Sequence, residues 1–282
     1  MASIWLDMSA IATIPALETA SARTLRIGSV SFLNAKPLIW GLEGSRDLDL
    51  RLAVPSKLLS GLKSAELDIA LLPVIDYQAM EGLCIVPSGG IGCDGETLTV
   101  RIFSKKPMAE IRTLACDTDS HTSIALARVI FAEQYGQRPE FIAWDPAKRG
   151  ETPCDAHLLI GDKVVCEEPL GFEHQIDLGS AWKTLTGLPF VFAVWTARQG
   201  VDLSDLPARL ERAKREGLGH VSEIVQRYAI GRGWPAGLAM QYLTVYLKFD
   251  VGERELGAIR LFHELAAKHG AMTSKVRELQ LY

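Results

Sequence analysis

The chain has 282 residues, of which 48% are hydrophobic and 23% are charged, and its formal net charge is −4. These values are ordinary for a globular protein, and a chain of this length can bury a large core without disulfides or metal ions. The slight excess of acidic residues and the lack of a long basic run exclude nucleic acid as an expected partner. No apolar run reaches the ~18 residues of a membrane span, so no membrane partner is expected.

Residues 1–24 are predicted to be an N-terminal extension that precedes the fold. They are apolar and rich in Ala, Ser and Thr, but no Lys or Arg precedes Arg23, whereas a secretory signal begins with basic residues. The five cysteines have no C-x-x-C spacing, which favours reduced thiols over a disulfide framework or a zinc site. Both observations favour a cytoplasmic protein.

A strand, a turn and a helix are predicted at the start of the fold. Residues 25–30 form a short apolar strand, and Pro37 is placed to open a helix because its missing N–H would have no partner in the first turn. Ser31 and Asn34 then lie between a strand's carboxyl end and a helix's positive end, where ligands bind in open α/β sheets. The alternative is that both side chains only satisfy a turn.

Predicted strands and helices alternate after this segment. A helix begins at Pro55, and residues 89–95 form a glycine-rich loop without the spacing of a dinucleotide-binding motif. This alternation indicates a mostly parallel α/β sheet. The predicted strands cover residues 48–54, 68–73, 83–87, 98–104, 111–117, 141–144, 156–162 and 190–195.

A second corner of the same kind is predicted before the helix 122–135. Ser120, Thr122 and Ser123 offer several hydroxyls at one helix start, next to free backbone N–H groups. They predict either a well-capped helix or a second anion-binding corner that faces the first.

The order of elements predicts an α/β protein with two lobes and a ligand cleft between them, as in type II periplasmic binding proteins. Residues 25–104 together with 191–282 would form the first lobe, and 105–190 the second. The chain is helical from about residue 206 onward, and these late helices are expected to pack on the first lobe. Oligomeric state is not predicted.

Motifs for the common kinds of catalysis do not occur. The sequence has no G-x-S-x-G elbow, no Walker A loop, no H-E-x-x-H and no histidine at metal-ligand spacing. No metal and no cofactor are therefore expected. Hydroxyls, an amide and backbone N–H groups in a cleft suit a small carboxylate, but they are compatible with a binding protein as well as with an enzyme.

The segment Ser29–Leu38, SVSFLNAKPL, resembles the opening signature of the chorismate dehydratases of the futalosine route to menaquinone. This family has the two-lobed fold and uses no cofactor. It is a family of hydro-lyases that convert chorismate to 3-[(1-carboxyvinyl)oxy]benzoate. The resemblance continues through residues 54–56, 67–73, 94–95, 100–104, 117–123, 158–162, 177–179 and 185–195.

The resemblance implies that Asn34 is the catalytic amide, which orients the leaving hydroxyl or the proton acceptor. Our hypothesis is that the substrate's own enolpyruvyl carboxylate takes the proton. His121 stands where arginine is expected in many members, so the charge at this position would depend on pH. The substrate-binding residues would be Ser31, Ser56, Thr99, Ser120, His121, Thr122 and Ser123.

Two alternatives to a chorismate dehydratase stay open at this stage. One is the sister enzyme of the same pathway, which makes 1,4-dihydroxy-6-naphthoate. The other is a non-catalytic, cytoplasmic solute-binding protein for a small carboxylate.

Overall fold

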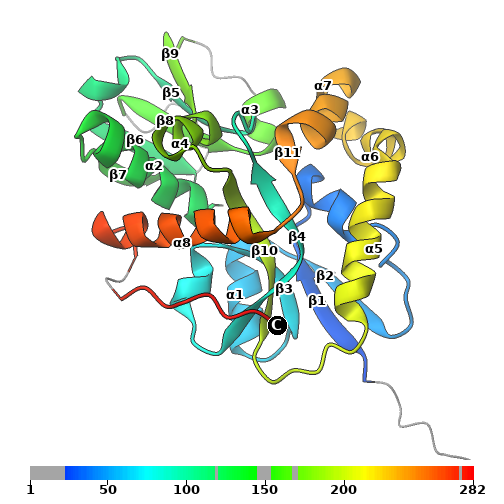
Figure 1. Cartoon of the computed structure of the whole chain (residues 1–282). Coiled ribbons are helices and arrows are strands. Elements are labelled where there is room, and N and C mark those ends of the chain that lie inside the picture. Colours follow the sequence, from blue (N-terminus) through cyan, green and yellow to red (C-terminus); the bar gives the residue numbers. More distant parts are fainter. Residues whose placement is uncertain (1–22, 118–119, 145–153, 167–170, 273–274) are drawn as a thin grey trace, which may run out of the picture.

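A computed structural model describes residues 23–117, 120–144, 154–166, 171–272 and 275–282. Nearly all of the predicted extension, residues 1–22, lies outside this part of the chain. The described part contains two β-sheets with helices packed around them, which confirms the predicted α/β class (Figure 1). Within these ranges, no helix combines the length and the apolar character needed to cross a lipid bilayer.

The first sheet has six strands in the order β11-β4-β10-β3-β1-β2. β1 pairs in parallel with β2 and β3, while β10 is antiparallel to both β3 and β4. The strands are β1 (Leu25–Ser29), β2 (Leu48–Leu52), β3 (Ile69–Pro73), β4 (Leu83–Cys93), β10 (Phe190–Arg198) and β11 (Leu247–Lys248).

The second sheet has five strands in the order β7-β6-β8-β5-β9. They are β5 (Val100–Ser104), β6 (Thr113–Asp117), β7 (Glu140–Trp144), β8 (Ala156–Ile160) and β9 (His174–Asp177). β5 pairs with β8 and β9, so strand pairing assigns it to the second lobe, whereas we expected the first lobe to extend to residue 104. The chain therefore crosses from the first sheet to the second before Val100. The sheet that β5 joins depends on pairing with strands that are distant in the sequence.

Eight α-helices surround the sheets in the described part of the chain (Figure 1). α5 packs on β4 of the first sheet, as expected for the late helices, whereas α8 contacts both α2 and β10. The helices are α1 (Pro55–Lys63), α2 (His121–Tyr135), α3 (Asp162–Cys166), α4 (Leu178–Thr186), α5 (Leu206–Gly219), α6 (Val221–Tyr228), α7 (Ala236–Gln241) and α8 (Glu253–Lys268).

Two local predictions differ from the structure. The glycine-rich segment is the end of β4 rather than a loop, because its glycines allow a close approach to β10. A Cβ on Gly90 would lie 2.6 Å from the Ala193 carbonyl oxygen, and one on Gly92 would lie 2.7 Å from that of Phe190. The helix predicted to open at Pro37 begins earlier, as the 3₁₀ helix η1 (Leu33–Ile39).

A buried carboxylate joins three strands of the first sheet. Asp68 has no exposed side-chain surface and pairs with Arg23 at 2.6 Å, Arg26 at 2.8 Å and Arg198 at 3.0 Å. Burial raises the pKa of Asp68, but the hydrogen bonds and charge of Arg26 outweigh it and bring the pKa to about 2. The carboxylate is therefore charged at neutral pH and ties β1 to β3 and β10.

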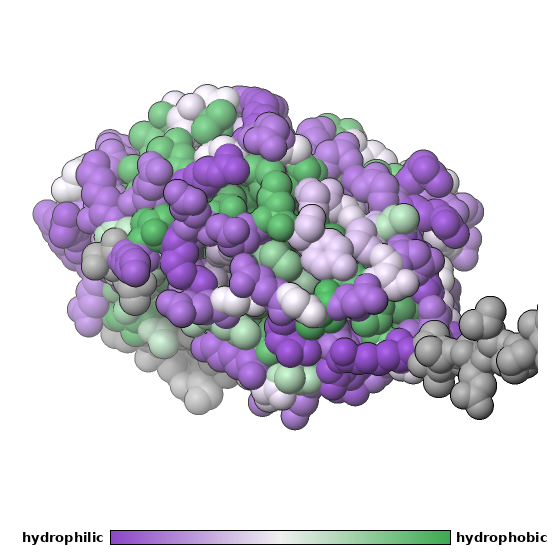
Figure 2. All heavy atoms as spheres, turned by 60° about the horizontal axis from the view of Figure 1, so that its bottom comes forward, coloured by the Kyte–Doolittle hydropathy of each residue, from purple (hydrophilic) through white to green (hydrophobic). Residues whose placement is uncertain are grey.

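The outer surface mixes polar and apolar side chains. In the view of Figure 2, hydrophilic residues separate the exposed hydrophobic ones over most of the face. Four of the five cysteines, Cys84, Cys93, Cys116 and Cys154, are buried, and free cysteines in such positions pack as small apolar residues.

Candidate functional site

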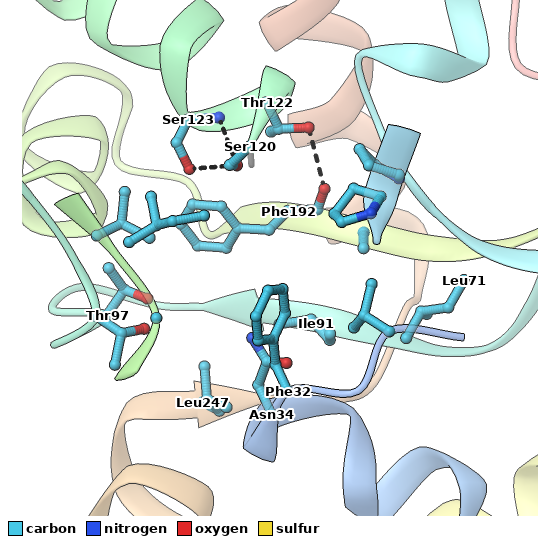
Figure 3. Close-up of a pocket in the computed structure, with 18 of the residues that line it drawn as sticks. Phe32, Asn34, Leu71, Ile91, Thr97, Ser120, Thr122, Ser123, Phe192 and Leu247 are labelled. Atoms are coloured by element: carbon cyan, nitrogen blue, oxygen red, sulfur yellow. Dashed lines mark hydrogen bonds between the residues drawn. The ribbon is translucent and has the colours of Figure 1, made fainter. Parts of the chain in front are cut away.

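A cavity lies between the two lobes, outside the carboxyl ends of β1, β3 and β8. Val30, Pro73 and Ile160 mark these three strand ends in its wall. This is the place where open α/β sheets bind ligands. Figure 3 shows Phe32 and Asn34 on one side, Ser120, Thr122 and Ser123 on the other, and Phe192 between them. The two corners predicted from the sequence therefore share one cavity.

Asn34 lies in η1 and directs its amide into the cavity wall. Its Oδ1 is buried and has no hydrogen-bond partner among the described residues. Tyr242 also lines the cavity, and its hydroxyl lies 2.9 Å from the Thr99 Oγ1. Burial raises the pKa of Tyr242, and the hydrogen bond with Thr99 only partly opposes this rise. The phenol therefore stays neutral at physiological pH.

The opposite corner is the first turn of α2. Ser120 is its N-cap, and the Ser120 Oγ accepts a hydrogen bond from the Ser123 backbone N–H at 3.2 Å. The Ser120 hydroxyl donates to the Ser123 Oγ at 2.8 Å, which leaves the Ser123 proton available to a ligand. Thr122 donates to the Phe192 carbonyl oxygen at 3.3 Å, so it ties α2 to β10 (Figure 3).

The segment that crosses between the sheets brings two threonines, Thr97 and Thr99, to the cavity. Asp177 caps α4 by accepting the Ser180 N–H at 3.0 Å. The same carboxylate accepts the N–H of Thr97 at 3.0 Å and that of Leu98 at 2.9 Å. One buried side chain therefore fixes both a helix start and the segment that carries the threonines.

Five of the predicted site residues line the cavity: Asn34, Thr99, Ser120, Thr122 and Ser123. Ser31 is exposed, and its carbonyl oxygen accepts a hydrogen bond from Arg232 at 3.1 Å. The side chain of Ser56 lies outside the described residues, although its neighbour Pro55 lines the cavity.

The structure does not bring His121 to the cavity. Its Nδ1 lies 2.9 Å from Asp76 Oδ1, and both residues line a separate hollow together with Arg128. The hydrogen bond to Asp76 raises the pKa of His121. Neighbouring residues of a helix point about 100° apart, so Thr122 faces the cavity when His121 faces away from it.

Tyr242 lines the cavity but was not among the site residues predicted from the sequence. The residue is buried, but its hydroxyl reaches Thr99 in the wall of the cavity. The only signal was that a buried tyrosine hydroxyl needs a partner. Nothing in the local sequence identifies a partner that lies 143 positions away in the chain.

The described residues that line the cavity are uncharged: hydroxyls, one amide and apolar side chains. Within the described ranges, no three His, Cys, Asp or Glu residues lie close enough to hold a metal ion. The arrangement can bind an anionic ligand through hydroxyl and N–H donors and offers a fixed amide to a polar group on it.

Comparisons with known proteins agree with this geometry. The model of the menaquinone biosynthesis family matches residues 25–268. A chorismate dehydratase from Thermus thermophilus is 30% identical over 258 residues, which cover 84% of this chain and 93% of that protein.

Two solved structures support the fold alone. Protein AF1704 from Archaeoglobus fulgidus has a TM-score of 0.68 at 14% identity, over 88% of this chain and 98% of that one. The periplasmic aliphatic sulphonate binding protein SsuA from Escherichia coli has a TM-score of 0.62 at 15% identity, over 92% of this chain and 93% of that one. The predicted two-lobed, binding-protein-like fold is therefore confirmed.

Proposed function

Since the chain belongs to the menaquinone biosynthesis family, we propose that it is a chorismate dehydratase, a carbon–oxygen lyase that forms 3-[(1-carboxyvinyl)oxy]benzoate. The observation that carries the proposal is the shared cavity, which Asn34 lines on one side and the hydroxyl-rich start of α2 lines on the other. The same two corners carry the sequence segments that resemble this family.

The reaction suits a cavity without charged side chains. Chorismate loses the proton at C3 and the hydroxyl at C4, and the ring becomes aromatic, which makes the reaction strongly downhill. A site that holds the substrate in a reactive geometry and stabilises developing charge with fixed dipoles can then supply much of the rate. The neutral phenol of Tyr242 adds no competing base.

We assign the anion-binding role to the start of α2. The Ser123 hydroxyl and the N–H groups of the first helical turn can donate to one substrate carboxylate. Thr97 and Thr99 offer further hydroxyls in the cavity wall. In this arrangement, the substrate carboxylate is bound by hydrogen bonds rather than by ion pairs with Lys or Arg side chains.

We assign Asn34 to the reacting end of the substrate. Its Oδ1 can accept a hydrogen bond from the C4 hydroxyl and hold it in line to leave. The substrate's enolpyruvyl carboxylate would take the C3 proton and pass it to the departing hydroxyl, so that water leaves and no external base is consumed. We place the enzyme in the cytoplasm, in keeping with its four buried thiols.

The test is to incubate the purified protein with chorismate and follow aromatic absorbance and product mass. The expected result is catalytic formation of a benzoate that is lighter than chorismate by one water. Binding of chorismate without conversion would overturn the proposal and indicate a solute-binding protein. Absence of both binding and conversion would direct the search to the sister reaction that gives 1,4-dihydroxy-6-naphthoate.

A further inference from the structure

Two consecutive residues of β10, Phe192 and Ala193, both line the cavity. Neighbouring residues of a regular strand point to opposite faces of the sheet, so β10 departs from regular geometry here. The pairing of β10 with β4 shows how. Val191 pairs with Gly92. The adjacent residue of β4, Ile91, pairs with Ala193, so Phe192 is an extra residue that forms a β-bulge. Such bulges occur often beside active sites, where they redirect a side chain.

We infer that Phe192 is a specificity-determining residue, whose ring packs against the six-membered ring of the ligand and selects a planar, aromatic one. This inference rests on the proposed function for the nature of that ligand, and it names the feature of the ligand that the cavity recognises besides its carboxylates. The roles assigned above use the Phe192 carbonyl oxygen but not its ring.

The backbone of the bulge is fixed from both lobes. The Phe192 carbonyl oxygen accepts a hydrogen bond from the Val74 N–H at 3.0 Å and one from the Thr122 hydroxyl at 3.3 Å. Val74 follows β3 of the first sheet, and Thr122 lies in the first turn of α2. A carbonyl oxygen has two lone pairs, and these two bonds use both. The bulge therefore has a defined orientation relative to the anion-binding corner.

The half-buried ring of Phe192 rests on a buried aromatic cluster. The ring of Phe190 lies 4.7 Å from it between centroids, at an interplanar angle of 71°. Phe190 in turn meets Trp182 at 5.3 Å and Phe262 at 5.0 Å, again with the rings nearly perpendicular. Edge-to-face contacts of this kind are favourable for aromatic pairs. The Phe192 ring is therefore held in place before a ligand binds, which lowers the cost of binding.

The position of the ring suits a flat ligand that is anchored by a carboxylate. Figure 3 shows Phe192 between Asn34 and the start of α2. A ligand with a carboxylate at the start of α2 and a polar group at Asn34 must therefore pass the Phe192 ring. An aromatic ring gains a specific contact there, whereas a puckered saturated ring does not. In the proposed reaction the substrate ring becomes aromatic, so the contact strengthens as the reaction proceeds.

The test measures the binding of benzoate and of its saturated analogue, cyclohexanecarboxylate, to the full chain by nuclear magnetic resonance titration. The quantity compared is the ratio of the two dissociation constants, because both probes carry the same carboxylate. Phe192→Leu removes the aromatic ring and should reduce the preference for benzoate about 2- to 10-fold. Phe192→Met also removes the ring at similar volume and should give the same reduction, which provides a second variant if the first does not fold.

Phe141→Leu is the matched control. It changes another half-buried phenylalanine, on β7, that is not part of the cavity wall, and it should keep the wild-type ratio. A wild-type ratio in the folded Phe192 variants would overturn the inference. Equal affinity of the wild type for the two probes, or no binding of benzoate, would overturn it as well.

These titrations involve no turnover, so the inference and the proposed function can fail separately. A benzoate preference that depends on Phe192, in a protein that leaves chorismate unchanged, would support the inference and contradict the proposed function. Conversion of chorismate together with an unchanged ratio in the Phe192 variants would support the proposed function and refute the inference.

Discussion

Asp177 holds Leu98 in a left-handed backbone conformation. Asp177 Oδ2 accepts the Leu98 N–H at 2.9 Å, and Leu98 has a φ of 69°. For a residue other than glycine, this conformation costs about 1 kcal/mol or more. The conformation therefore persists only where surrounding hydrogen bonds impose it. The bond therefore shapes the segment that carries Thr97 and Thr99 to the cavity.

We expect Asp177→Asn and Asp177→Ala to differ in a way that isolates this bond. Asn keeps one acceptor for Ser180 and Thr97 but presents an NH₂ group to the Leu98 N–H. Asp177→Asn should raise KM for chorismate with modest destabilisation, while Asp177→Ala should lose about 1–3 kcal/mol of unfolding free energy. Denaturant unfolding and steady-state kinetics of both variants test this, and unchanged KM in Asp177→Asn would contradict it.

The two serines at the start of α2 should separate stability from binding. Ser120 caps the helix through the Ser123 N–H, so Ser120→Ala should cost about 1 kcal/mol of stability as well as substrate affinity. Ser123→Ala leaves the cap acceptor in place and should raise KM with little change in stability. Thermal unfolding and KM of the two variants are the measurements. Equal melting temperatures would show that the Ser120 bond does not stabilise the helix.

Acid should destabilise the protein through His263. Burial lowers the pKa of His263 from 6.5 to about 4, and its neutral ring donates from Nε2 to the Val74 carbonyl and accepts from Gln78. Between these two pKa values, His263 is protonated in the unfolded chain but neutral in the folded protein. The free energy of unfolding therefore falls as the pH falls through this window. The loss approaches about 3 kcal/mol at its lower end.

The check is the unfolding free energy at several pH values between about 7 and 5. His263→Gln should be less stable than the wild type at neutral pH but should show a flatter pH dependence. His220→Gln, at an exposed position, is the matched control and should keep the wild-type slope. Parallel slopes for the wild type and His263→Gln would rule out His263 as the source.

Local patterns predicted the two corners of the site because their signals lie within a few residues of each other. The cap at Ser120 and the strand before Asn34 are of this kind, and both segments line the cavity. The sheet that β5 joins depends on pairing with distant strands, which no local pattern encodes. The orientation of His121 was missed for a different reason: it depends on Asp76, which lies 45 positions away in the chain.

Asn34 should respond differently to loss of its amide and to replacement by a carboxylate. Asn34→Ala removes the free Oδ1 and should lower kcat at least tenfold, or ~1.4 kcal/mol of barrier, with KM nearly unchanged. Asn34→Asp keeps an acceptor oxygen but adds negative charge to a cavity whose described lining is uncharged, so it should also raise KM for a doubly negative substrate. Steady-state kinetics with chorismate give both values. A kcat within tenfold of the wild type in Asn34→Ala would show that the amide is not part of the chemistry. A KM in Asn34→Asp equal to that in Asn34→Ala would show that the substrate's charges lie away from this corner.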